Sequence, residues 1–249
     1  MKDEVILITG SGKGIGREAA LLAASQGAAV AVADIDEAAA AATCAEIGEA
    51  QGRAIGLTFD VTDEDSVKSG FDSVIGAFGR LTGLVNNAGG SSLHDGPVTE
   101  VPVDEFRRAI ELDLVGTFLC CRHGIPLISA AGGGSVVNMA SLLGLRGTAG
   151  RDAYTAAKGG VVSLTRSMAV EFAADKIRVN AIAPGAVLTE RMQTFIEKDP
   201  RVQANVAKHL LGLPGPREIA EAIVYLLGPT TRHMTGAIIP IDGGRGVSA

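Results

Sequence analysis

The sequence contains no tryptophan, only two tyrosines and only three cysteines among its 249 residues. Cys44, Cys120 and Cys121 are an odd number and lack the spacing of a zinc site or a C-x-x-C pair, so we expect small core residues in a reducing compartment. His94 and His209 have no cysteine or carboxylate cluster around them. We therefore expect no metal site.

The sequence also lacks a basic excess and a long apolar run. The 22 Lys and Arg residues against 28 Asp and Glu residues give a net charge of −6, which argues against a nucleic-acid or anionic-membrane surface. No run approaches the roughly 20 apolar residues that span a bilayer, and the opening MKDEVILITG is too short for a signal sequence. We expect a soluble, cytoplasmic protein whose partners are a small molecule and copies of itself.

Strand-like and helix-like segments alternate along one chain, whose 47% hydrophobic content supplies one large core. Apolar, β-branched runs occur at 5–9, 30–34, up to residue 60, and at 83–87, 135–139, 177–183 and 237–242. Helical spacing occupies 17–26, 37–51, 66–78, 104–128, 153–173 and 218–227. The pattern predicts an α/β fold over residues 1–249, a single Rossmann-like doubly wound parallel sheet of about seven strands with helices on both faces.

One interval, 188–216, breaks this alternation. It mixes charged residues with Met192, Phe195, Leu210 and Leu211, between a Pro-Gly pair and a Pro-Gly-Pro. We interpret it as a helical excursion outside the sheet, a small substrate lid.

A glycine-rich turn follows the first strand, in the sequence TGSGKGIG at 9–16. The spacing is G-x-x-x-G-x-G rather than G-x-G-x-x-G. It allows a tight turn at Gly10, close approach of the backbone to a pyrophosphate at Gly14, and close packing of helix on strand at Gly16. An ordinary strand-to-helix turn is the alternative.

Asp34 ends the second strand, where a carboxylate accepts hydrogen bonds from the ribose hydroxyls of a dinucleotide. A 2′-phosphate would be repelled there, which favours NAD over NADP. Lys13 points weakly the other way, because a cation in the turn could meet that phosphate. Asp34 or Asp36 could also cap the helix that opens at Glu37, which is compatible with the ribose role.

Tyr154 and Lys158, in the stretch AYTAAK, are four residues apart on a helix, with Cβ atoms about 5 to 6 Å apart. A phenol with a pKa of about 10 must drop by about 3 units to exchange protons near neutrality. One ammonium about 4 Å away supplies about the required 4 kcal/mol at an effective dielectric constant of about 20. The spacing is sufficient for acid–base catalysis, although an exposed helix pair would look the same.

These features together resemble the classical short-chain dehydrogenase/reductase family over essentially the whole chain. The resemblance is carried by TGSGKGIG, Asp34, Asp60-Val61, NNAG at 86–89, Ser141, Tyr154 with Lys158, Asn180 and PGAVLT at 184–189.

The resemblance implies the role of each site residue. Tyr154 would exchange the proton with the substrate oxygen, Ser141 would hydrogen-bond that oxygen, and Lys158 would hold the nicotinamide ribose and lower the pKa of the phenol. The implied cofactor-binding set is Gly10, Ser11, Lys13, Gly14, Ile15, Gly16, Asp34, Ile35, Asp60, Val61, Asn86, Ala88, Gly89, Tyr154, Lys158, Pro184, Gly185, Val187 and Thr189. The implied function is NAD-dependent hydride transfer between nicotinamide and a secondary alcohol or ketone, in a homotetramer.

Asp113 departs from the family, which usually carries asparagine at this place to hold a water that links the lysine to solvent. An aspartate accepts from water but brings a negative charge toward Lys158, so we expect activity with an altered pH profile.

Two other functions remain open. An NADPH-dependent 3-oxoacyl-carrier-protein reductase would carry a neutral residue at Asp34 and an arginine in the glycine turn, and a non-catalytic dinucleotide-binding protein would not need the Tyr154 and Lys158 pair.

Overall fold

The seven predicted strands form one parallel sheet in the computed structural model, which describes residues 1–248. The strands are β1 (Val5–Thr9), β2 (Ala29–Asp34), β3 (Arg53–Thr58), β4 (Gly83–Asn86), β5 (Gly134–Met139), β6 (Ile177–Pro184) and β7 (Ile238–Ile241). Their order is β3-β2-β1-β4-β5-β6-β7, and every neighbouring pair is parallel. The chain order reverses between β1 and β4, where a doubly wound sheet binds its ligand.

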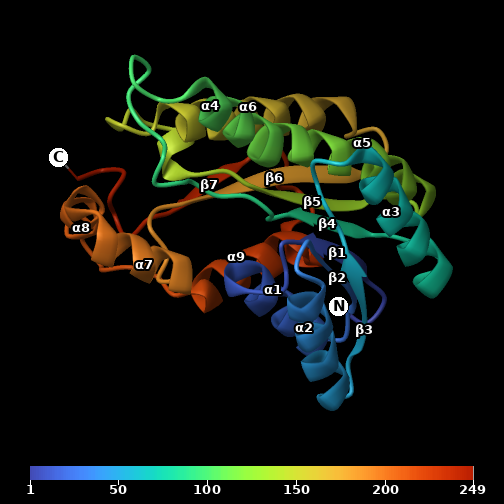
Figure 1. Ribbon diagram of the computed structural model, residues 1–249. Coiled ribbons are helices and arrows are strands. Elements are labelled where there is room, and N and C mark those ends of the chain that lie inside the picture. Colours follow the sequence, from blue (N-terminus) through green and yellow to red (C-terminus); the bar gives the residue numbers. More distant parts are fainter. Residues whose placement is uncertain (249) are drawn as a thin grey trace.

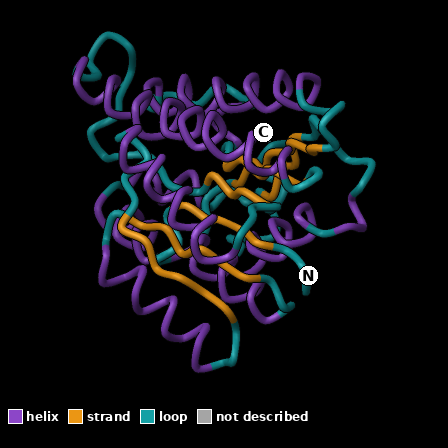
Figure 2. The backbone as a smooth tube through the Cα atoms, turned by 90° about the vertical axis from the view of Figure 1, so that its right-hand side faces the viewer, coloured by secondary structure: helices purple, strands orange, loops and turns teal. Residues whose placement is uncertain are grey.

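Helices cover both faces of the sheet (Figure 1). One face carries α1 (Gly14–Ser25), α2 (Glu37–Glu49) and α9 (Pro216–Leu227), and the other carries α3 (Glu64–Phe78), α4 (Val103–Ala109), α5 (Gly116–Ala130) and α6 (Asp152–Glu171). Figure 2 shows the strands as one twisted layer inside the helices. Alternate residues of β1 enter different cores, Ile6 and Ile8 on one face and Leu7 on the other. Burial on both faces explains why the strands are apolar throughout.

The helix expected over 104–128 is interrupted. The chain leaves α4 through one stretch of π-helix, η1 (Ile110–Val115), before it continues as α5. Asp113 lies in η1 and is fully buried, and the Thr117 hydroxyl donates to its carbonyl oxygen at 2.9 Å. Single π turns occur often at functional sites. The helical segment expected over 104–128 is confirmed, but the apolar spacing of the sequence does not reveal the extra residue of the π turn.

Residues 188–216 contain two short helices outside the sheet, α7 (Glu190–Lys198) and α8 (Pro200–Val206). Thr189 caps α7 by accepting the N–H of Met192 at 3.2 Å, and Asp199 caps α8 by accepting that of Arg201 at 2.9 Å. Neither helix contains a buried residue. Within residues 1–248, none of the helices is both long enough and apolar enough to cross a membrane.

Candidate active site

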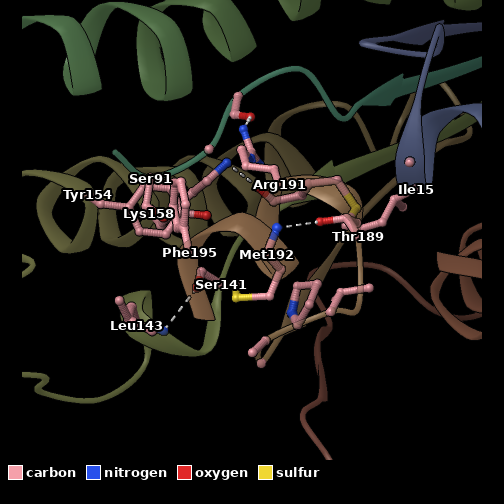
Figure 3. A pocket seen from close by; sticks show the side chains of 18 of the residues that line it. Ile15, Ser91, Ser141, Leu143, Tyr154, Lys158, Thr189, Arg191, Met192 and Phe195 are labelled. Carbon is pink, nitrogen blue, oxygen red and sulfur yellow. Dashed lines mark hydrogen bonds between the residues drawn. The ribbon is translucent and has the colours of Figure 1, made fainter. Parts of the chain in front are cut away.

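A cleft of about 1430 Å³ opens where the strands end. It is lined by residues that directly follow β1 through β6, by the start of α6, and by α7 and α8 (Figure 3). Because parallel strands bring their carboxyl ends to one edge of the sheet, residues far apart in the sequence meet there.

Most of the site residues expected from the sequence line this cleft. They are Gly10, Lys13, Gly14, Ile15, Asp34, Ile35, Asp60, Val61, Ala88, Gly89, Ser141, Tyr154, Lys158, Pro184, Gly185, Val187 and Thr189. Ser11, Gly16, Asn86 and Asp113 do not line it.

Asn86 is a correction to the expected cofactor-binding set. Its side chain is buried and donates to Asn138 Oδ1 at 2.8 Å, away from the cleft. The next residue, Asn87, lines the cleft instead and donates to the carbonyls of Thr9 and Gly10, each at 2.9 Å. Two adjacent asparagines on one strand end face opposite sides, and the sequence does not indicate which side is the cleft.

The glycine turn has the conformation that a pyrophosphate site needs. Gly10 and Gly14 have φ of 62° and 57°, which side chains other than glycine rarely adopt. Lys13 is the N-cap of α1 and its side chain makes no cap hydrogen bond. The N–H groups of the first turn of α1 are therefore free of a side-chain partner at the cleft, which suits a phosphate.

Gly16 sits where α1 crosses this turn, and a Cβ there would lie 2.3 Å from the Gly10 carbonyl oxygen. We expect Gly16→Ala to push α1 away from the turn, lowering the free energy of unfolding by about 1–3 kcal/mol and weakening the binding of a dinucleotide such as NADH. Gly76→Ala is the matched control, because a Cβ on this α3 glycine meets no atom within 4 Å and helical alanine is favoured. Unchanged NADH affinity in Gly16→Ala would contradict the assignment.

Asp34 is held by the glycine turn. Its Oδ2 accepts the Gly12 N–H at 2.8 Å, and its Oδ1 accepts that of Asp36 at 3.0 Å. Asp36, not Asp34, caps α2, and it also pairs with the exposed Lys13 ammonium at 2.8 Å. The residue that caps the helix opening at Glu37 is therefore Asp36, and Asp34 lines the cleft.

Ser141, Tyr154 and Lys158 come together from two elements. Ser141 follows β5 and accepts the N–H of Leu143 at 3.2 Å, whereas the other two lie on one face of α6. The Lys158 ammonium is 5.7 Å from the centre of the Tyr154 ring. Figure 3 shows Tyr154 and Lys158 beside each other, with Arg191 next to them.

The Lys158 ammonium forms a buried ion pair with Asp113, whose negative charge was expected near the lysine. Its Nζ donates to the Met139 carbonyl at 2.7 Å and lies 3.0 Å from Asp113 Oδ1. Burial lowers the pKa of Lys158, but the Asp113 carboxylate and Tyr154 outweigh it, so the net shift is upward. The lysine therefore stays charged. Asp113 contacts the ammonium directly through Oδ1.

The Asp113 carboxylate is fully buried, and its Oδ1 also accepts the Gly90 N–H at 2.8 Å. Among residues 1–248 its Oδ2 has no hydrogen-bond partner. A Cβ at Gly89 would lie 2.2 Å from Oδ1, so glycine is needed at this place. The carboxylate thus joins the loop after β4 to Lys158.

The expectation that Lys158 brings the phenol near neutrality is wrong for the chain alone. Burial raises the pKa of Tyr154, Lys158 lowers it, and the Asp113 charge raises it again, with a net upward shift. Weaker contributions from Arg191 and from a hydrogen bond with Ser141 lower the pKa. The spacing argument considered one cation and omitted desolvation and the buried anion behind it.

Arg191 and Asp95 contact residues of the expected site but were not singled out from the sequence. The Arg191 guanidinium lies over Gly90 and donates to the Gly89 carbonyl at 3.1 Å, connecting α7 to the loop after β4. Asp95 is buried and accepts the backbone N–H of Tyr154 at 3.0 Å. No spacing in the sequence links either residue to its partner, because about a hundred and about sixty residues separate them.

Comparisons with known proteins agree with this geometry. A family model described as enoyl-(acyl carrier protein) reductase matches residues 10–245. The cis-4-hydroxycyclohexanecarboxylate dehydrogenase of Sinomonas cyclohexanicum is 42% identical over 242 residues, covering 97% of this chain and 96% of that one. The crystal structure of levodione reductase is 32% identical, with a TM-score of 0.94 and 99% of both chains covered.

A second solved structure is 7α-hydroxysteroid dehydrogenase in complex with NADH and 7-oxo glycochenodeoxycholic acid. It is 33% identical with a TM-score of 0.91, and covers 97% of this chain and 93% of that one. The fold, the cleft and these relatives lead to one conclusion. The chain belongs to the classical short-chain dehydrogenase/reductase family of oxidoreductases.

Proposed function

We propose that the protein is an NAD-dependent oxidoreductase that interconverts a secondary alcohol on a saturated ring and the corresponding ketone. The observation that carries this proposal is the single cleft that joins Tyr154, Lys158 and Ser141 to the glycine turn and Asp34. Two of the related proteins bear names of ring hydroxyl compounds, a hydroxycyclohexanecarboxylate and a 7α-hydroxysteroid. Both relatives support the ring as substrate class.

The residues of the cleft suit a nicotinamide dinucleotide. The glycine turn and the uncapped start of α1 would hold the pyrophosphate, and Asp34 would accept the adenosine ribose hydroxyls. Asp60 and Val61 line the adenine end, and Pro184 with Thr189 the nicotinamide end. When bound, the cofactor supplies the hydride donor or acceptor.

The chain's own contribution is proton transfer and orientation. Tyr154 would hold or accept the proton of the substrate hydroxyl, and Ser141 would donate a hydrogen bond to the same oxygen. An ammonium has three donors, and Met139 and Asp113 use two of those on Lys158. The third remains for a ribose hydroxyl. The permanent charge of Lys158 favours the phenolate of Tyr154 during turnover.

The helices α7 and α8 would act as a lid over the substrate. Arg191, Met192 and Phe195 line the cleft from α7. On its other side the lid meets the start of α6, where the Arg151 guanidinium lies 3.6 Å from the buried Asp199 carboxylate. This ion pair would fasten the lid to the start of α6.

An assay of ring alcohols with both cofactors tests the proposal. We expect NADH formation with cyclohexanols, including cis-4-hydroxycyclohexanecarboxylate, and with 7α-hydroxysteroids, and slower turnover with NADP. Ketones of the same compounds should be reduced with NADH. No turnover of any alcohol in the presence of demonstrated NADH binding would instead support a non-catalytic dinucleotide-binding protein.

Asp34→Asn should change the cofactor preference. The amide keeps the shape and can accept one of the two N–H groups, that of Gly12 or that of Asp36. It loses the charge that repels a 2′-phosphate and binds ribose hydroxyls. Charged hydrogen bonds contribute about 1.5–3 kcal/mol, so we expect the ratio of kcat/KM for NAD to that for NADP to fall about tenfold or more. Glu37→Gln, the same change of charge on the exposed start of α2, is the control. An unchanged ratio would remove the argument for NAD.

NADPH-dependent reduction of a carrier-bound 3-oxoacyl chain is the second candidate. The description of the matching family model, enoyl-(acyl carrier protein) reductase, shares the carrier-bound substrate but names reduction of a carbon–carbon double bond. Asp34 disfavours this candidate, because NADPH carries the 2′-phosphate. Faster turnover of a 3-oxoacyl thioester with NADPH than of any ring alcohol with NAD would reverse the order.

We include a homotetramer in the proposal. Large apolar side chains are exposed on the helices expected to pack between copies, at Val103 and Phe106 on α4, Phe118 on α5 and Val170 on α6. Exposed apolar surface gathered on neighbouring helices favours self-association.

A further inference from the structure

The first turn of α6 is capped by a residue from another part of the chain. The N-cap residue of this helix, Arg151, makes no side-chain cap hydrogen bond. Asp95 provides the cap instead: its Oδ1 accepts the Ala153 N–H at 3.1 Å and its Oδ2 accepts the Tyr154 N–H at 3.0 Å. The side chain of Asp95 is buried, with 5% of the residue exposed. These are the N–H groups that a capping carboxylate normally accepts.

The loop that carries Asp95 is tied to the same turn by its backbone. The Gly96 carbonyl accepts the Asp152 N–H at 3.2 Å, and Asp152 Oδ2 accepts the Val98 N–H at 2.7 Å. Arg151 donates to the Ser92 carbonyl. The segment 92–98 and the start of α6 therefore form one hydrogen-bonded unit.

A second buried carboxylate holds the other end of this loop. Asp113 Oδ1 accepts the Gly90 N–H and contacts the Lys158 ammonium. The loop after β4 is thus fixed at its start to the catalytic lysine and at its end to the backbone of the tyrosine. Two carboxylates from different elements thus contact α6, one at the backbone of Tyr154 and one at the Lys158 ammonium.

We propose that Asp95 is a positioning residue for Tyr154, whose carboxylate fixes the phenol relative to Ser141 and Lys158 by capping α6 from the loop after β4. This inference rests on the proposed function for the role of Tyr154. Hydrogen bonds to an ionised acceptor are short and strong, and a misplacement of about 1 Å at a reacting group costs up to about a hundredfold in rate.

The kinetic test compares two variants of Asp95 with two variants of a matched cap. In Asp95→Asn the amide oxygen can still accept the N–H of either Ala153 or Tyr154, but the NH₂ group faces the other N–H and cannot accept it. We expect kcat to fall about tenfold in Asp95→Asn and up to about a hundredfold in Asp95→Ala, with the KM for NAD unchanged. Asp63 is an exposed carboxylate that caps α3 from its own N-cap position, accepting the N–H groups of Asp65 and Ser66 at Oδ1, and it lies outside the cleft. Asp63→Asn and Asp63→Ala should leave kcat unchanged.

A second readout needs no turnover. The chain has two tyrosines and no tryptophan, so in a Tyr225→Phe background Tyr154 is the sole source of the near-ultraviolet tyrosine signal. We expect Asp95→Ala to weaken its circular dichroism in the folded protein, because a ring that is no longer fixed loses its asymmetric surroundings, and Asp63→Ala to leave it unchanged.

The outcomes separate this inference from the proposed function. If the wild-type protein turns over no alcohol while the dichroism still depends on Asp95, the proposed function fails and the positioning stands. If the wild type is active but both Asp95 variants keep kcat within about twofold, or if the Asp63 variants lose as much, the positioning role is wrong.

Discussion

Tyr154→Phe should lower kcat by about 10²- to 10⁴-fold, the usual contribution of a general acid or base. The substitution keeps the ring against α6 and removes only the hydroxyl that exchanges the proton. NADH affinity and the free energy of unfolding should therefore stay close to wild type. Steady-state kinetics with a ring alcohol, together with NADH titration, measure both.

The other tyrosine supplies the control. Tyr225 lies on α9, about half exposed and outside the cleft, so Tyr225→Phe should leave kcat unchanged. A Tyr154→Phe protein with kcat within tenfold of wild type would show that another group carries the proton.

Lys158→Met should destabilise the fold as well as abolish turnover. Methionine fills the space of the lysine stem, but it leaves the fully buried Asp113 carboxylate without a counter-ion. Removing one partner of a buried ion pair costs about 3–5 kcal/mol, so we expect the free energy of unfolding to fall by about that amount. Denaturant unfolding measures it.

Two further variants identify the cause. Lys158→Met combined with Asp113→Asn removes both charges, and it should recover most of the lost stability while remaining inactive. Arg217→Met breaks an exposed ion pair with Glu221 on α9 and should cost less than about 1 kcal/mol. A double variant no more stable than Lys158→Met would mean that lost packing, not the stranded carboxylate, is responsible.

The sequence revealed those parts of the fold that depend on local pattern. Strands buried on both faces must be apolar throughout, and the runs at 5–9 and 135–139 match β1 and β5 almost residue for residue. The sequence also revealed the glycine turn, because the positive φ angles at Gly10 and Gly14 demand glycine. The family resemblance then provided the roles of Ser141, Tyr154 and Lys158.

What the sequence did not reveal depends on contacts between distant segments. Asp113 lies in the π turn at η1, and its carboxylate contacts Lys158. Tyr154 therefore lies beside a buried ion pair, whereas the spacing argument considered a single cation. Asp95 looked like an ordinary loop residue because its partners, Ala153 and Tyr154, lie on another element. The direction of the Asn86 side chain was likewise decided by packing against Asn138.

The account rests on Tyr154 ionising under the control of Lys158 and Asp113, and the ultraviolet titration of its phenolate tests this directly. In the Tyr225→Phe protein without cofactor, burial and the Asp113 charge should raise the pKa of Tyr154 above that of free tyrosine, about 10. Adding Asp113→Asn removes the negative charge, so this pKa should fall, and the rise of alcohol oxidation with pH should move to lower pH with it. A pKa of Tyr154 that is unchanged or higher in Asp113→Asn would contradict the account.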